Sequence, residues 1–159
     1  RTDMDAVDIG SMMNTLVDAY RTTRVNSGIN LSFKQGQAGV FVVKGIRPRL
    51  GQVWRNLIDN AYSFSAKGQT VTISLTLEGR DVVIEVRDQG VGLPAGAEEK
   101  IFTRFYSERP ESEEFGTHSG LGLAISQQIV EAHNGVIRAE NNDDGGASFI
   151  VTLPLLIEK

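Results

Sequence analysis

The apolar residues of this chain follow two periods in turn, a repeat of about 3.6 that is typical of helices and a repeat of about 2 that is typical of strands. Three segments carry the helical repeat, at about 9–20, 50–61 and 121–135. The first follows Asp8, and Asp8 or a nearby acid would be its N-cap; the third ends at Asn134 and Gly135, a common helix ending. We therefore expect three main helices.

Short segments between the helices, in which apolar and polar residues alternate, predict strands. We expect them at about 29–33, 40–44, 71–77 and 82–86, and a final hairpin whose arms read VIRAEN and ASFIVTLPL. This order predicts an α+β fold, a two-layer sandwich with the helices on one face of a mixed, mostly antiparallel sheet.

Composition narrows the possible classes of protein. The length of 159 residues, with 40% apolar and 23% charged residues, suits a single domain over 1–159. A net charge of −4 argues against a nucleic-acid surface, and the absence of cysteine removes disulfides and zinc–thiolate sites. No apolar run approaches the ~20 residues that cross a bilayer, so we expect a soluble domain without membrane contact. A start in mid-pattern and an end just after a strand suggest that it is excised from a larger protein.

Two asparagines in the segment NLIDNAYSFS, Asn56 and Asn60, lie one turn apart at the edge of the apolar stripe of the second helix. A carboxamide oxygen is a hard, neutral ligand that suits Mg²⁺, an ion usually shared with substrate phosphates. The alternative is that one or both side chains only cap or bridge the backbone, which is the more common case for such a pair taken alone.

A carboxylate follows the strand at 82–86. Asp88 shares the parity of its apolar residues, so we expect it on the covered face of the sheet. A buried carboxylate needs a donor, and the amino group of a purine is one candidate. Gly90 and Gly92 would let a flat ring approach the backbone. The alternative is an ordinary Asp-Gly turn.

Glycines also open the third helix, in the segment GLGLAI with Gly120, Leu121 and Gly122. Free N–H groups at a helix start form an anion site suited to phosphates, although a glycine-rich loop without a ligand is common. Neither a Walker loop nor a Rossmann fingerprint is present. The stretch at about 89–120 has no sustained period and is too long for a connector, which predicts a functional lid.

Taken together, these motifs resemble the ATP-binding catalytic domain of bacterial sensor histidine kinases, in the superfamily shared with gyrase, Hsp90 and MutL. The matching segments are NLIDNA (N box), DQGVGLP (G1 box), IFTRFY (F box) and SGLGLAI (G2 box). The stretch from FYSERP to IVEAH is most similar to the ChvG/ExoS subgroup. The resemblance covers nearly the whole chain and implies the Bergerat ATP-binding fold.

The resemblance implies that the ligands are ATP and Mg²⁺. Asn60 would coordinate the metal, Asn56 would support the triphosphate, and Asp88 would accept a hydrogen bond from the adenine amino group. Gly90 and Gly92 would shape the base pocket.

The same resemblance implies a mobile lid at about 93–119, anchored by Phe102 and Phe105. Gly120, Leu121 and Gly122 would let the lid and the helix start wrap the phosphates. Ser148 occupies a position from which a hydroxyl commonly reaches the purine edge.

Two positions depart from the family pattern. Many members carry basic residues where this chain has Ser63 and Ser107. Arg104 or Arg109 could supply the missing charge, or each could be a solvated surface arginine.

The phosphoacceptor motif H-E-x-x-x-P is absent, and neither histidine resembles it. We expect His118 to be exposed and His133 to interact with the carbonyl end of the third helix. The implied partners are therefore a separate dimerisation and phosphoacceptor domain of the same parent kinase and, indirectly, a response regulator. The implied location is the cytoplasmic part of an inner-membrane sensor kinase.

Two other functions remain open. One is a stand-alone ATPase of the gyrase, Hsp90 and MutL kind, which places a glutamate base one turn before the metal asparagine. That position is Asn56 here, and an amide cannot take a proton. The other is a non-catalytic nucleotide-sensing or protein-interaction domain.

Overall fold

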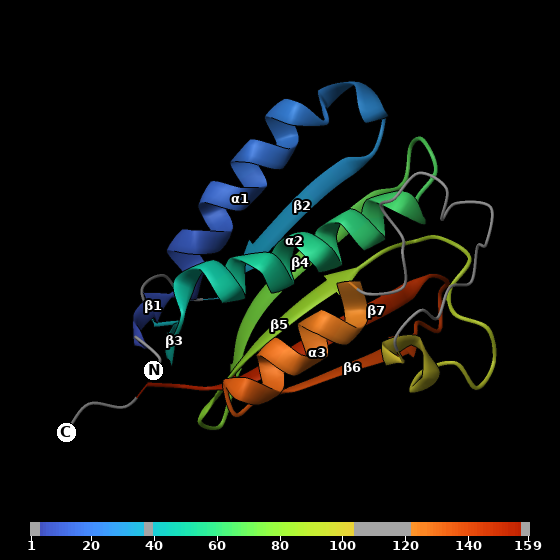
Figure 1. The fold of residues 1–159 in the computed structure, drawn as a ribbon. Helices are drawn as coiled ribbons and strands as arrows, with labels where there is room; N and C mark the ends of the chain where they lie inside the picture. The colour runs from blue at the N-terminus through green and yellow to red at the C-terminus, as the bar shows by residue number, and fades with distance from the viewer. Residues whose placement is uncertain (1–3, 37–39, 104–121, 157–159) are drawn as a thin grey trace.

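A computed structural model describes residues 4–36, 40–103 and 122–156 of the chain. Three helices cover one face of a five-stranded sheet with the strand order β2-β4-β5-β7-β6 (Figure 1). The elements are β1 (Asp5–Asp8), α1 (Ile9–Thr23), η1 (Val25–Ser27), β2 (Asn30–Gln35), β3 (Val42–Gly45), α2 (Arg47–Ser63), β4 (Thr70–Glu78), β5 (Asp81–Arg87), η2 (Lys100–Phe102), α3 (Gly122–Ala132), β6 (Val136–Asn141) and β7 (Ala147–Pro154), where η is a short 3₁₀ helix. The predicted α+β sandwich is confirmed.

The sheet is mixed and mostly antiparallel, as predicted. β2 pairs with β4 in parallel, whereas the β4–β5, β5–β7 and β6–β7 pairs are antiparallel. Alternate residues on each central strand are buried beneath the helices, because successive side chains of a strand point to opposite faces. The core therefore lies between the sheet and the helical layer.

The helices form where the apolar spacing predicts them. The apolar stripe of α2 is buried in full, at Leu50, Val53, Trp54, Leu57, Ile58 and Ala61. Asp8 caps α1, since its Oδ1 accepts a hydrogen bond from the Ser11 N–H at 3.1 Å. At the end of α3, Asn134 adopts a positive φ of 64° and the Gly135 N–H donates to the Val130 carbonyl, a left-handed helix ending.

One strand was missed, and another has an unexpected partner. β1 pairs antiparallel with β3 in a separate two-stranded sheet, so the strand expected at about 40–44 does not join the main sheet. β1 is only four residues long and buries only Val7, which leaves little alternation to read.

His133 behaves as predicted, with an added contact. Its Nδ1 lies 2.8 Å from the Ile129 carbonyl oxygen in the last turn of α3, and its Nε2 accepts the Ile46 N–H at 3.0 Å. A neutral ring that carries its proton on Nδ1 satisfies both contacts. The side chain thereby joins the end of α3 to the start of α2.

The helices of the described part of the chain include none that is long and apolar enough to cross a membrane.

Substitution of Gly135 tests how closely the end of α3 packs against the sheet. A Cβ there would lie 2.4 Å from the Thr152 carbonyl oxygen and 2.7 Å from Leu153 Cδ2. Gly135→Ala should therefore destabilise the domain by about 1–3 kcal/mol, the usual cost of overpacking. Gly36→Ala is the matched control, because its nearest new contact would be 3.6 Å away. Equal urea midpoints for the two variants would contradict this packing.

Candidate functional site

Four chain segments meet at one end of the sandwich: the last turns of α2, the end of β5, the start of β7 and the start of α3 (Figure 1). Hydrogen bonds link β5 to β7 through Asp88 and Ala147, and link α2 to α3 through Asn56 and Gly122. The structure thus brings Asn56 and Asn60 of α2 together with Asp88 and Gly122, which come from segments far away in the sequence. This corner is the candidate site.

Asp88 is the buried carboxylate of the corner. Its side chain is on the covered face, as strand parity predicts, and the residue is 2% exposed. Its Oδ1 accepts hydrogen bonds from the N–H groups of Gly90 at 2.9 Å and Ala147 at 3.2 Å. Among the described residues, Oδ2 has no hydrogen-bond partner. Asp88 therefore forms the expected Asp-Gly turn and still offers one oxygen to a ligand.

Burial raises the pKa of the Asp88 carboxyl, and the two backbone N–H donors only partly oppose this shift. A hydrogen-bond donor that binds Asp88 Oδ2 would lower the free-energy cost of burying the charged carboxylate.

The glycines after Asp88 are required by the packing of the protein itself. A Cβ at Gly90 would lie 2.2 Å from the Phe64 carbonyl oxygen. Gly92 has a φ of +84°, and a Cβ there would lie 2.7 Å from Asn141 Oδ1. Their predicted role toward a flat ring stays a prediction.

Asn141, at the end of β6, is a residue that sequence reasoning missed. Its Oδ1 accepts the Leu93 N–H at 2.7 Å and its Nδ2 donates to the Leu93 carbonyl at 3.0 Å. The carboxamide thus pairs with Leu93 as a strand would, and it fixes the point where the predicted lid begins. No local pattern marks such a contact, since its partners are 48 positions apart.

Phe102 is the described aromatic residue of the predicted lid. It is 7% exposed and packs edge-to-face on Phe149 of β7, with ring centroids 6.2 Å apart and an interplanar angle of 81°. This contact ties the first part of the predicted lid to the core.

Asn56 bridges two helices. Its Nδ2 lies 3.1 Å from the Gly122 carbonyl oxygen and 3.1 Å from Ser126 Oγ. The alternative interpretation of the asparagine pair was that a side chain bridges to the backbone, and the Asn56 side chain makes such a bridge. The role of Asn56 toward a triphosphate stays a prediction.

Asn60 differs from Asn56, because its carboxamide has no hydrogen-bond partner among the described residues and its Nδ2 is buried. An unpaired N–H group suits an acceptor such as a phosphate oxygen, and the carboxamide oxygen stays available to a cation. Trp54 Nε1 and Asn142 Nδ2 are also buried without a partner among the described residues, so the unpaired nitrogen alone does not mark a metal site. Within the described ranges, no cluster of three or more His, Cys, Asp or Glu residues could hold a metal alone. The donor set fits Mg²⁺ shared with phosphates, because Mg²⁺ keeps most of its waters and uses few protein ligands.

The structure does not place Ser148 with these residues. Ser148 is paired with Arg87 on β5, and its side chain is on the face opposite Phe149, away from the helices. Its hydroxyl hydrogen-bonds to Glu85 at 2.6 Å and Asn142 at 2.9 Å. Ala147 is the β7 residue beside Asp88, which corrects the expectation that Ser148 reaches a base there.

Several predicted site residues lie outside the described residues: Arg104, Phe105, Ser107, Arg109, His118, Gly120 and Leu121. Ser63 is described, and its hydroxyl donates to the Asn60 carbonyl at 2.8 Å.

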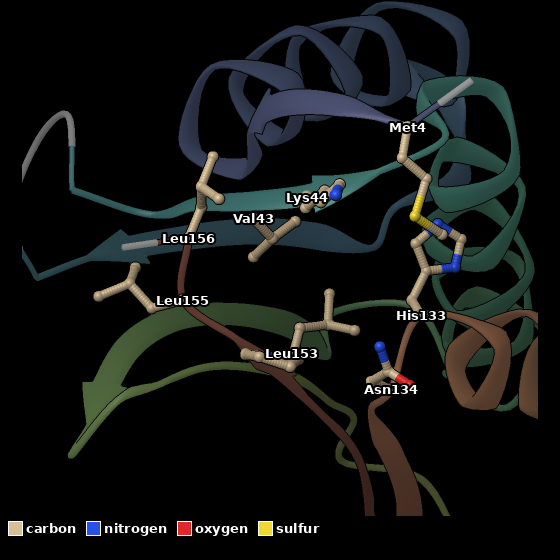
Figure 2. A pocket seen from close by; sticks show the side chains of 9 residues that line it. Met4, Val43, Lys44, His133, Asn134, Leu153, Leu155 and Leu156 are labelled. Atoms are coloured by element: carbon tan, nitrogen blue, oxygen red, sulfur yellow. The ribbon is translucent and has the colours of Figure 1, made fainter. Parts of the chain in front are cut away.

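A pocket of about 220 Å³ lies at the other end of α3, between β3 and the end of β7 (Figure 2). Its walls include Val43, Leu153 and Leu155, with Met4 beside His133. Both His133 nitrogens are already hydrogen-bonded. Lys44 and Asn134 also line this pocket, but none of Asn56, Asn60, Asp88 and Gly122 does, so we do not assign the site to it.

Comparison with known proteins agrees with the motifs. A family model described as "Histidine kinase-, DNA gyrase B-, and HSP90-like ATPase" matches residues 45–157. The sensor protein ChvG of Rhizobium meliloti (strain 1021) is 40% identical over 97% of this chain and 29% of that protein. BaeS of Escherichia coli (strain K12), a signal transduction histidine-protein kinase, is 34% identical over 94% of this chain and 32% of that protein. The chain thus spans about a third or less of these two relatives.

Solved structures share the fold over nearly the whole chain. The catalytic domain of histidine kinase ThkA has a TM-score of 0.84 and 23% identity, and the alignment covers 99% of this chain and 100% of that one. The mycobacterial sensor histidine kinase MprB has a TM-score of 0.81 and 26% identity, over 98% and 100%. A further ThkA structure, with a TM-score of 0.81, is a complex with the response regulator protein TrrA.

The raised pKa of Asp88 predicts a pH-dependent cost to stability. The native carboxyl keeps its proton to higher pH than the unfolded one, so the free energy of unfolding falls as pH rises from about 4 through the native pKa. Asp88→Asn removes this slope, and without ligand it should be at least as stable as wild type at pH 8. Its advantage should shrink toward pH 4 in urea titrations.

Asp143→Asn is the control for this titration, because Asp143 is exposed and makes no ion pair with a described residue. A constant stability loss in Asp88→Asn at every pH would mean that Asp88 is retained for stability alone.

Proposed function

Because the chain belongs to the histidine kinase-, DNA gyrase B- and HSP90-like ATPase family, we propose that it binds Mg-ATP and presents the γ-phosphate to a histidine of a separate dimerisation and phosphoacceptor domain. The observation that carries the proposal is the corner itself. A buried carboxylate, with one oxygen that has no hydrogen-bond partner among the described residues, lies near the half-buried carboxamide of Asn60, which has no such partner either.

Base recognition is assigned to Asp88. Its free Oδ2 is an acceptor in a low-dielectric setting, where it suits the exocyclic amino group of adenine. Guanine carries a carbonyl at that position, which a carboxylate would repel. The loop that follows, held by Gly90 and by the Asn141–Leu93 contacts, keeps the carboxylate and the backbone around it in place.

The phosphate end is assigned to α2 and α3. Asn60 is the metal ligand, and Mg²⁺ when bound would offset the negative charge of the phosphates. α3 begins at Gly122, and the N-terminus of a helix favours anions. Gly120, Leu121 and one of Arg104 and Arg109 are proposed to complete this end from the lid.

The chemistry needs little beyond positioning. Phosphoryl transfer depends on alignment and charge neutralisation, and the attacking group would be the acceptor histidine of the other domain. A hydrolase of this superfamily would instead need a base at Asn56. The amide accepts no proton, and its nitrogen is already committed to α3. This favours transfer over hydrolysis.

The partners and location are proposals about the parent protein. ChvG and BaeS are named as a sensor protein and a signal transduction kinase, and this chain aligns with about a third or less of each. We assign the chain to the cytoplasmic side of a sensor kinase. A response regulator, as in the ThkA–TrrA complex, would take the phosphoryl group after the acceptor histidine.

An assay of the domain alone and mixed with its phosphoacceptor domain distinguishes a kinase from an ATPase. The isolated domain should bind Mg-ATP, turn it over far more slowly than about 1 s⁻¹, and not label itself. Adding the cognate helical-hairpin domain should give acid-labile, alkali-stable phosphate on that partner only. Turnover near 1 s⁻¹ by the domain alone, abolished in Asn60→Ala, would establish the ATPase instead. Binding without transfer would indicate a nucleotide-sensing domain.

The metal role of Asn60 is tested by calorimetry with an ATP analogue, with and without Mg²⁺. Asn60→Ala should weaken binding only when Mg²⁺ is present, and it should cost little stability because the side chain makes no hydrogen bond with a described residue. Asp88→Asn is the matched contrast and should lose about 1–3 kcal/mol in both conditions. Equal losses for Asn60→Ala with and without the metal would show that Asn60 has a structural role.

A further inference from the structure

Ser126 is a buried polar residue that the motifs do not single out. It lies in α3, one turn after Gly122, and is 0% exposed. Its hydroxyl oxygen receives a hydrogen bond from Asn56 Nδ2 at 3.1 Å. Burial of a serine hydroxyl is costly unless the group is paired, so the contact is a specific one.

The contact decides which atom Asn56 can offer. A primary amide has two N–H groups, and the two acceptors on α3, the Gly122 carbonyl and Ser126 Oγ, engage Nδ2. The carboxamide makes no other hydrogen bond within the described ranges. Its oxygen is therefore the atom left for a ligand, on the same helix flank as Asn60.

Without the Ser126 hydroxyl, only the Gly122 carbonyl would hold the amide. One N–H would be freed, and the carboxamide could turn its nitrogen toward the ligand. An oxygen there suits a cation or a water bound to it, whereas a nitrogen would donate to a phosphate oxygen. The orientation thus sets the kind of ligand that Asn56 serves.

From this geometry we infer that Ser126 is a positioning residue, which fixes the Asn56 carboxamide with its oxygen toward the site and joins the start of α3 to α2. The inference rests on the proposed function, because it specifies how the phosphate end of that same site is ordered. Gly122 contributes a backbone carbonyl that substitution cannot remove, so Ser126 is the acceptor that mutation can test.

The first experiment needs no nucleotide. In the wild-type domain, the side-chain amide protons of Asn56 are hydrogen-bonded and should exchange slowly with water in NMR spectra. Ser126→Ala should speed this exchange about three- to tenfold, in line with the loss of one hydrogen bond. Ser74→Ala, a half-buried serine on the open face of β4, should leave it unchanged. Unchanged exchange in Ser126→Ala overturns the inference even if the domain binds ATP.

The second experiment measures binding of a non-hydrolysable ATP analogue by calorimetry. Ser126→Ala should weaken binding about three- to tenfold with Mg²⁺ and leave it near wild type with EDTA. In an Asn56→Ala background the Ser126 change should have no further effect, because Ser126 acts through Asn56. Additive losses, or equal losses with and without Mg²⁺, overturn the inference.

Ser126→Cys covers the case in which alanine disturbs folding. Sulfur is a weak acceptor of similar size, so this variant should lie between wild type and Ser126→Ala in both readouts. A Ser126→Cys domain that matches wild type in exchange and in binding overturns the inference. If the wild-type domain itself does not bind the analogue with Mg²⁺, the proposed function is wrong. The exchange experiment still tests the Asn56–Ser126 hydrogen bond, because it needs no nucleotide.

Discussion

The burial of one carboxylate organises the corner on which the site depends. Asp88 continues the inward parity of β5 past the end of the strand. Its Oδ1 accepts the N–H of Ala147 at the start of β7 and the N–H of Gly90 in the loop that follows Asp88. The surrounding backbone is packed closely enough that a Cβ at Gly146 would lie 2.0 Å from the Asp88 carbonyl oxygen. The protein itself provides hydrogen bonds to Oδ1 of Asp88 and leaves Oδ2 for a ligand. The burial of this incompletely paired carboxylate lowers the stability of the free domain.

Helix α2 serves the core and the site at once. Its apolar stripe is buried against the sheet, and the flank of that stripe carries Asn56 and Asn60. The two side chains differ, since the Asn56 carboxamide is held by α3, whereas the Asn60 carboxamide has no hydrogen-bond partner among the described residues. Packing of α2 therefore sets the distance between the asparagines and Asp88. Core substitutions that shift α2 should also change this distance.

Sequence reasoning worked where a pattern is local and strong. The helical stripes and the parity of Asp88 were readable because burial repeats along one segment. The Ser148 expectation came from the family resemblance rather than from a pattern in this chain. Strand parity could not have tested it from the sequence, because residues on both faces of β7 are buried. The Asn56–Ser126 and Asn141–Leu93 contacts join positions 70 and 48 residues apart, so only the fold reveals them.

The most direct test of the account is a crystal structure of the domain with a non-hydrolysable ATP analogue and Mg²⁺. The account predicts the adenine amino nitrogen about 2.7–3.2 Å from Asp88 Oδ2 and the Asn60 carboxamide oxygen about 2.0–2.1 Å from the metal. An analogue bound in the pocket beside Val43 and Leu153, or an adenine that makes no contact with Asp88, would contradict it.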